Sequence, residues 1–215
     1  MTTAVLTHAP TLGALLRAPV TSAALASYLD GLDQAGRLRE ARSLGGGLQK
    51  KLWDACADAA PLTLEEFLPS SLPDGKLLAY GGRNSLPLFS LFEKRFTRQG
   101  GAVIGYNQSG VSGLTGPGYF AIEAGTGARA KELLFDYERV PARAPAGQPP
   151  VQSNDRGLAR LVFGGLHDFC RRVATGVVIG EATRRGQPMG AYFVLARMPG
   201  QAVDGAGKTG SALRA

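Results

Sequence analysis

Residues 177–198 read VVIGEATRRGQPMGAYFVLARM and place two apolar segments on either side of a short, glycine-containing link. Val177 to Thr183 and Ala191 to Met198 are rich in β-branched and aromatic residues, which favour strands. A link this short joins antiparallel neighbours, because a parallel crossover needs about a dozen residues or more. This stretch therefore predicts two antiparallel strands near the end of the chain.

Further segments of the same kind precede this pair, separated by turns that draw on the chain's 30 glycines and 13 prolines. We expect about seven strands in all, enough for an antiparallel sheet to curve strongly or to close into a barrel. Pro141 to Pro150 is expected to be an extended loop, because its prolines cannot take part in a sheet ladder. The other expected strands are Lys76–Tyr80, Ala102–Tyr106, Tyr119–Glu123, Glu132–Glu138 and Leu158–Phe163.

Two segments of this β-rich region have a different pattern. Leu88 to Phe96 carries apolar residues at helical spacing and is predicted to be a short helix or plug. Leu166 to Val173 is predicted to hold a helical turn, and no other helix fits between the later strands.

The N-terminal third predicts helices. Leu25, Tyr28 and Leu29 recur at spacings of three and four, and Leu48 and Leu52 do so after a run of glycines at 45–47. Thr63 followed by Glu66 is a capping-box pattern that predicts one more helical start. The fold class is therefore α+β, with helices packed on a sheet.

The chain divides into a few regions on these patterns. Residues 21–198 are expected to form a single domain, with a helical leader at 21–66 and a barrel-like body at 75–198. Residues 1–20 are expected to be flexible, and residues 199–215 are expected to form a disordered tail because they contain little that can be buried.

Composition narrows the class of protein. Apolar residues make up 44% and charged residues 19%, which is ordinary for a globular chain. No secretory signal or spanning segment is evident, so we expect a soluble, cytoplasmic protein without a membrane partner, able to form a homo-oligomer. Cys56 and Cys170 are expected to be free thiols.

The net charge of +7 raises the question of nucleic acid. Its 18 arginines are spread from Arg17 to Arg214, and only short doublets occur. Binders of nucleic acid usually cluster their basic residues and interleave aromatic ones. We therefore expect no nucleic-acid partner.

Three residues are candidates for acid–base catalysis. Asp136 lies on a strand that alternates polar and apolar residues, and either faces a pocket or belongs to a solvated acidic face. Histidine is the side chain that titrates near neutrality, but Asp168, the neighbour of His167, would face the opposite way on a strand, so a purely structural role is the alternative. Glu181 shares an apolar face with Val177 and is either at a wet strand end or buried with a partner such as Arg160.

Phenols and an amide beside the glycine-rich turns are candidates for fixing the polar atoms of a small ligand. The candidate binding residues are Tyr106, Asn107, Tyr119, Tyr137 and Tyr192. No HExxH, paired CxxC, GxSxG or P-loop pattern is present, so we expect no metal and no cofactor.

Residues 75–197 resemble the bacterial lipocalin-like, or calycin-type, small-ligand barrels. A short first strand ending at Gly81-Gly82 and the plug-like segment at 89–96 are shared features. The resemblance implies a cavity for a hydrophobic or amphipathic molecule and transfers no catalytic residue. The strings that carry it are GYN (105–107), GPGYF (116–120), LLFDYE (133–138) and VVIGEA (177–182).

The expected function is binding of a small hydrophobic or amphipathic molecule in a barrel cavity. Such a site could catalyse a cofactor-free acid–base step, namely cyclisation, isomerisation or elimination, on a lipid-like or polyketide-like metabolite. The alternatives are a non-catalytic carrier or sequestering protein and a protein-interaction module. A buried ionisable group in an aromatic lining favours the enzyme, a dry lining favours the carrier, and a flat apolar patch favours the module.

Overall fold

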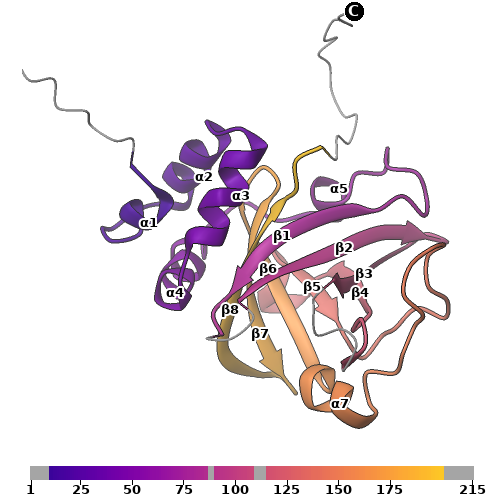
Figure 1. Ribbon diagram of the computed structural model, residues 1–215. Coiled ribbons are helices and arrows are strands. Elements are labelled where there is room, and N and C mark those ends of the chain that lie inside the picture. Colours follow the sequence, from indigo (N-terminus) through magenta and orange to yellow (C-terminus); the bar gives the residue numbers. More distant parts are fainter. Residues whose placement is uncertain (1–9, 87–89, 109–114, 201–215) are drawn as a thin grey trace, which may run out of the picture.

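A computed structural model describes residues 10–86, 90–108 and 115–200 and places eight antiparallel strands in one closed barrel (Figure 1). Each strand pairs with the next along the chain, and β8 returns to pair with β1. The expectation of an α+β chain with an antiparallel barrel is confirmed. The strands are β1 (Leu78–Asn84), β2 (Leu91–Gln99), β3 (Ala102–Gln108), β4 (Phe120–Ala124), β5 (Leu133–Asp136), β6 (Leu166–Ala174), β7 (Val177–Arg184) and β8 (Gln187–Arg197).

Four helices form a layer outside one side of the barrel (Figure 1). They are α1 (Leu12–Leu15), α2 (Ser22–Asp30), α3 (Gln34–Ser43) and α4 (Gly46–Ala55). Thr21 and Asp33 cap α2 and α3 with their side-chain oxygens. Leucines of these helices pack on the outward side chains of β7 and β8, including Ile179 and Val194. The helical face predicted for residues 21–60 is therefore buried against the sheet.

The inside of the barrel holds a second apolar core, rich in aromatic side chains. The short helix α5 (Leu64–Phe67) covers one end, where Phe67 stacks on Tyr80 with ring centroids 4.8 Å apart. The predicted cap is present, since the Thr63 hydroxyl accepts a hydrogen bond from the Glu66 amide. Helix α7 (Gly157–Phe163) covers the other end, and the 3₁₀ turn η1 (Gly127–Arg129) joins β4 to β5.

Three predictions of secondary structure are wrong, and those for β2 and α7 fail for the same reason. The helix or plug predicted for 88–96 is wrong for 91–96, which form the first part of β2, with Lys94 and Phe96 pointing into the barrel. Residues 88 and 89 of that prediction lie outside the described residues. Residues 158–163 are not a strand but lie in α7, where Ala159 and Phe163, four positions apart, are buried. In both places a short apolar run fits either period, and the pairing of neighbouring strands decides between them.

Smaller differences concern the ends of the chain and β6. Leu166 to Val173 is a strand rather than a helical turn. Residues 12–15, which belong to the stretch expected to be flexible, form α1 with Leu12 buried. Residues 1–9 of that stretch and 201–215 of the expected tail lie outside the described residues. Cys56 and Cys170 are free thiols, as expected. Within the described ranges no helix has the length and apolar character to cross a membrane.

Candidate functional site

Four polar side chains meet inside the barrel, toward the end covered by α7. Lys94 comes from β2 and Asn107 from β3, where the two residues are Cα partners. Tyr137 directly follows β5, and Asp168 lies on β6. Lys94 and Asp168 are each 3% exposed and Tyr137 is 2% exposed. An ammonium and a carboxylate are thus both enclosed in a core that is otherwise apolar. We call these four residues the interior cluster.

The Lys94 ammonium has three polar partners in this cluster. It donates to Asn107 Oδ1 at 2.9 Å, makes a short contact with the Tyr137 hydroxyl, and lies 3.5 Å from Asp168 Oδ2. The Tyr137 hydroxyl in turn donates to Asp168 Oδ2 at 3.3 Å. The Asn107 amide nitrogen donates to the Gly118 carbonyl, which fixes which end of the amide faces the lysine.

Aromatic rings surround the ammonium. Its nitrogen lies 4.9 Å from the ring centroid of Phe120, 5.1 Å from that of Tyr137 and 5.3 Å from that of Phe193. Ring faces attract a cation, and this attraction grows when water is excluded. Phe163 of α7 stacks on Tyr137 with centroids 5.4 Å apart and separates the cluster from the outside.

Burial shifts the proton affinities of the cluster toward neutral forms. Desolvation lowers the pKa of Lys94 below its usual value, and the charge of Asp168 opposes that shift. Desolvation likewise raises the pKa of Asp168, opposed chiefly by Lys94. The pKa of Tyr137 is raised well above its usual value by burial and by the carboxylate beside it. The pKa values of Lys94 and Asp168 are therefore closer together than those of an exposed lysine and aspartate, which favours proton transfer between the two groups.

Two of the residues predicted to bind a ligand, Asn107 and Tyr137, belong to the interior cluster. Tyr106 and Tyr119 lie outside the barrel instead, with ring centroids 5.0 Å apart. Their hydroxyls bond to Gln148 and to the Pro149 carbonyl, so the predicted 141–150 loop covers them. Tyr192 packs near Trp53 under the helical layer.

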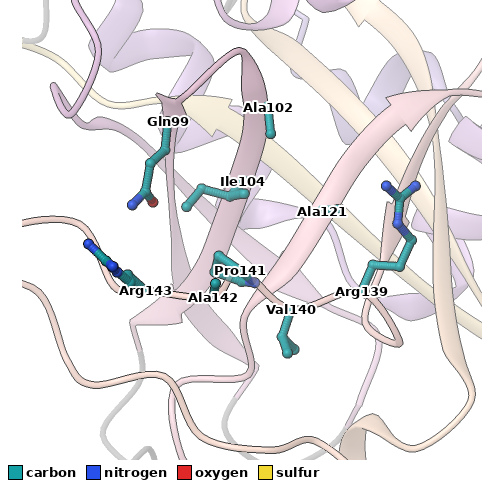
Figure 2. A pocket seen from close by; sticks show the side chains of 9 residues that line it. All are labelled: Gln99, Ala102, Ile104, Ala121, Arg139, Val140, Pro141, Ala142 and Arg143. Atoms are coloured by element: carbon teal, nitrogen blue, oxygen red, sulfur yellow. The ribbon is translucent and has the colours of Figure 1, made fainter.

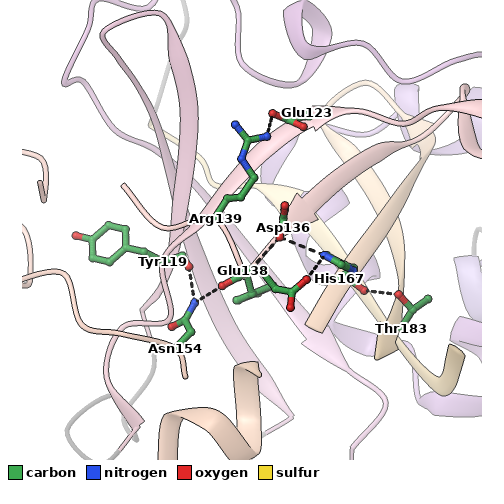
Figure 3. A network of polar contacts seen from close by, with 9 residues as sticks. Tyr119, Glu123, Asp136, Glu138, Arg139, Asn154, His167 and Thr183 are labelled. Carbon is green, nitrogen blue, oxygen red and sulfur yellow. Dashed lines mark hydrogen bonds and ion pairs between the residues drawn. The ribbon is translucent and has the colours of Figure 1, made fainter. Parts of the chain in front are cut away.

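The three predicted catalytic residues also lie on the outer face. Asp136 and His167 are Cα partners on β5 and β6, and His167 Nε2 lies 3.2 Å from Asp136 Oδ1 (Figure 3). The carboxylate beside the histidine is therefore Asp136 rather than its chain neighbour Asp168. Glu181 is buried and bonds at 2.8 Å to Arg129, not to Arg160.

A hollow of about 340 Å³ opens on the outer face of β3 and β4 (Figure 2). Ile104 and Ala121 form its floor, and the segment from Arg139 to Arg143 forms its wall. A second hollow of about 370 Å³ lies between the turn after α1 and the end of α4. None of the eight residues predicted for the site lines either hollow. Neither hollow is therefore the cavity that was expected around those residues.

The sequence patterns did not identify Lys94 or Asp168 as residues of the site. Lys94 falls in the segment read as a helix, where it shares a polar side with Glu93 and Arg95. If the segment is instead assigned as a strand, Lys94 shares a face with Phe92 and Phe96. A charged residue on an apolar strand face is unusual, and this pattern would have identified Lys94 as a candidate. Asp168 sits in the same way between the inward residues Leu166 and Cys170.

Comparisons with protein-family models, with curated proteins and with solved structures returned no match. The closed antiparallel barrel is compatible with the lipocalin-like shape that the sequence suggested, and with ligand binding. Any statement about function beyond this fold-level compatibility therefore rests on the residues of the site.

Proposed function

We propose that the barrel binds a small, mostly apolar molecule with a carbonyl group at its α7 end, and that the interior cluster moves a proton on it. The observation that carries this proposal is the enclosure of Lys94 and Asp168 among aromatic rings. Burying such a pair costs desolvation energy that a well-packed apolar pair would not. Apolar rings with a few converging polar groups are also the usual lining of a small-molecule site.

The cluster has the groups that proton transfer beside a carbonyl needs. The Lys94 ammonium donates a hydrogen bond to the carbonyl oxygen, and the Asp168 carboxylate accepts a proton from the adjacent carbon. The carbon–hydrogen bond breaks, its electron pair forms an enolate, and the ammonium stabilises the new negative charge. In a substrate with a carbon–carbon double bond β,γ to the carbonyl, Asp168 returns the proton to the γ-carbon, the double bond moves to the α,β position, and the outcome is an isomerisation. The raised pKa of Asp168 makes its carboxylate a stronger base.

Access to the cluster requires α7 to move, because Phe163 stacks over Tyr137. The helix spans seven residues and buries Ala159 and Phe163, whereas Leu158, Leu161 and Val162 are exposed. An element with so few buried contacts opens at low cost. We therefore place the entrance at α7, where only Arg184 among the arginines of the described residues donates to a carbonyl of the helix, at Val162. At α5, Arg197 donates to the Glu66 carbonyl and Arg98 to the Leu68 carbonyl just past the end of the helix.

The probe 6-propionyl-2-(dimethylamino)naphthalene tests binding and proton transfer together, because it is an apolar ketone whose emission reports its surroundings. We expect its emission to shift to shorter wavelength on binding, and deuterium from D₂O to enter its propionyl CH₂ group. Lys94→Met should weaken binding at least tenfold, about 1.4 kcal/mol. Asp168→Asn should keep affinity within tenfold and abolish deuterium uptake. Lys76→Met, at an exposed lysine, is the matched control.

A carrier without catalysis is the second candidate, favoured by the fact that the polar groups of the cluster already bond to one another. Probe binding with no deuterium uptake by the unaltered protein would select the carrier. Absence of probe binding, or equal binding by the Lys94→Met variant, would remove the interior cluster as a ligand site. A native mass spectrum of the protein from its own host would then search for the retained molecule itself.

A further inference from the structure

We propose that Asp136, Glu138 and His167 bind one divalent transition-metal ion, best matched by Zn²⁺, on the outer face of the barrel. Asp136 ends β5, Glu138 follows two positions later, and His167 lies opposite Asp136 on β6 (Figure 3). One ligand atom from each residue lies within 4.8 Å of the other two. We call these residues the outer trio. It is distinct from the interior cluster, because Tyr137 and Asp168, their chain neighbours, point inward.

The spacing of the donor atoms suits a small tetrahedral site. His167 Nε2 lies 3.2 Å from Asp136 Oδ1 and 3.4 Å from Glu138 Oε2. A tetrahedral Zn²⁺ ion with bonds of about 2.0–2.1 Å keeps its ligand atoms about 3.3 Å apart. Two of the three separations already match. The third can adjust, because the Glu138 side chain is 56% exposed.

The excess negative charge of the outer trio also favours a bound cation. Among the described residues, His167 is the only basic side chain within ion-pair distance of either carboxylate. Nearby Arg139 pairs with Glu123 instead (Figure 3). The other buried acids of the described residues have a permanently basic partner, since Glu132 and Glu181 pair with arginines and Asp168 with Lys94. Two carboxylates that share one imidazole keep a net negative charge in either protonation state of the histidine.

The ligand types narrow the choice of ion. One imidazole with two carboxylates suits Zn²⁺, Co²⁺ or Mn²⁺, whereas Ca²⁺ requires six or more oxygen ligands and Mg²⁺ a nearly ideal octahedron. Three protein ligands leave at least one coordination position open. The hollow of Figure 2 begins one strand away, since its lining residue Ala121 is the Cα partner of Asp136. A ligand that rests in that hollow could therefore reach the ion.

Titration of metal-free protein with Co²⁺ tests the site, because cobalt in a low-symmetry site absorbs visible light. We expect one Co²⁺ per chain, displaced by Zn²⁺, and a higher melting temperature in Zn²⁺. His167→Ala and Glu138→Gln should each weaken binding at least tenfold and remove the thermal shift. Glu138 is exposed, so its variant should fold normally. His8→Ala, which alters the only other histidine of the chain, is the matched control and should bind as the unaltered protein does.

Several results would overturn the proposal. They are no cobalt absorption with excess Co²⁺, equal affinity of the His167→Ala variant, or loss of binding in His8→Ala. Lys94→Met should keep full metal affinity, because it alters the interior cluster alone. The metal titration and the ketone-probe experiment therefore test two separate sites, and a negative result in one does not decide the other.

Discussion

At the scale of single residues, Lys94 and Asp168 are the unusual feature of this chain. Each is charged in its ordinary state, and each lies where charge is poorly solvated. Their separation of 3.5 Å lets each offset part of the other's desolvation cost. Removal of both should therefore cost less than the sum of the two single removals, because each single removal leaves one buried group without its partner.

Lys94→Met should destabilise the protein by about 3–5 kcal/mol at pH 7.5, and by less at pH 5. The pKa of Asp168 is raised by burial above its ordinary 3.8, and it rises further without the ammonium. The folded state then holds the proton more tightly than the unfolded chain. The deficit should therefore grow as the pH rises above 3.8, by at most about 1.4 kcal/mol per pH unit. Urea unfolding of variant and unaltered protein at both pH values measures it.

Asp168→Asn should behave in the opposite way. It leaves the ammonium unpaired, and burial lowers the pKa of Lys94 below its ordinary 10.5. The unfolded chain then binds the proton more tightly, so the deficit should shrink as the pH rises from 7.5 toward 10. The double variant should lose less stability at pH 7.5 than the sum of the two single losses. Additive losses, or the same pH trend in both variants, would contradict a coupled pair.

At the scale of elements, the sequence predicted most strands and the helical leader, because glycine turns and helical spacing mark them locally. It failed for β2 and α7, whose short apolar runs fit both periods, and for β6, where a helical turn was predicted. The site was harder still. Asp136 and His167 were both proposed, but their proximity depends on the register between β5 and β6, which no local pattern encodes. Lys94 was hidden by the wrong period assigned to its strand.

The two end helices should differ sharply in what they contribute to stability. Phe67 of α5 stacks on Tyr80 and meets Phe96 edge to face, with centroids 4.8 Å apart in both cases. Phe67→Ala should therefore cost about 3–5 kcal/mol. Leu161→Ala on α7, at a side chain that is 69% exposed, should change stability by at most about 0.5 kcal/mol. Comparable losses in denaturant unfolding would show that α7 is held more firmly than its contacts imply.

At the scale of the whole molecule, the positive charge is largely used to hold elements together. Arg37 donates to carbonyls at the end of α2 and at Thr175 between β6 and β7. Arg171 joins Glu132 to the Trp53 carbonyl, with its guanidinium 3.6 Å from the Trp53 ring centroid. Arg172 pairs with Glu66 of α5. Arginine suits this work, because its planar fork satisfies several acceptors at once.

Because these arginines are already bonded within the protein, we predict weak binding to nucleic acid in spite of the net charge of +7. Affinity for DNA grows with the number of phosphates that free basic side chains neutralise, and arginines already bonded to carbonyls and carboxylates must break those bonds first. We expect the full chain to bind a 20-base-pair duplex with a dissociation constant above about 10 μM at 150 mM salt, in the non-specific range. Fluorescence anisotropy at several salt concentrations measures both affinity and salt dependence. Arg185→Ser, at the exposed β7–β8 turn, should lower any residual binding, because that side chain is among the accessible ones. Submicromolar binding that survives excess competitor DNA would refute this account of the charge.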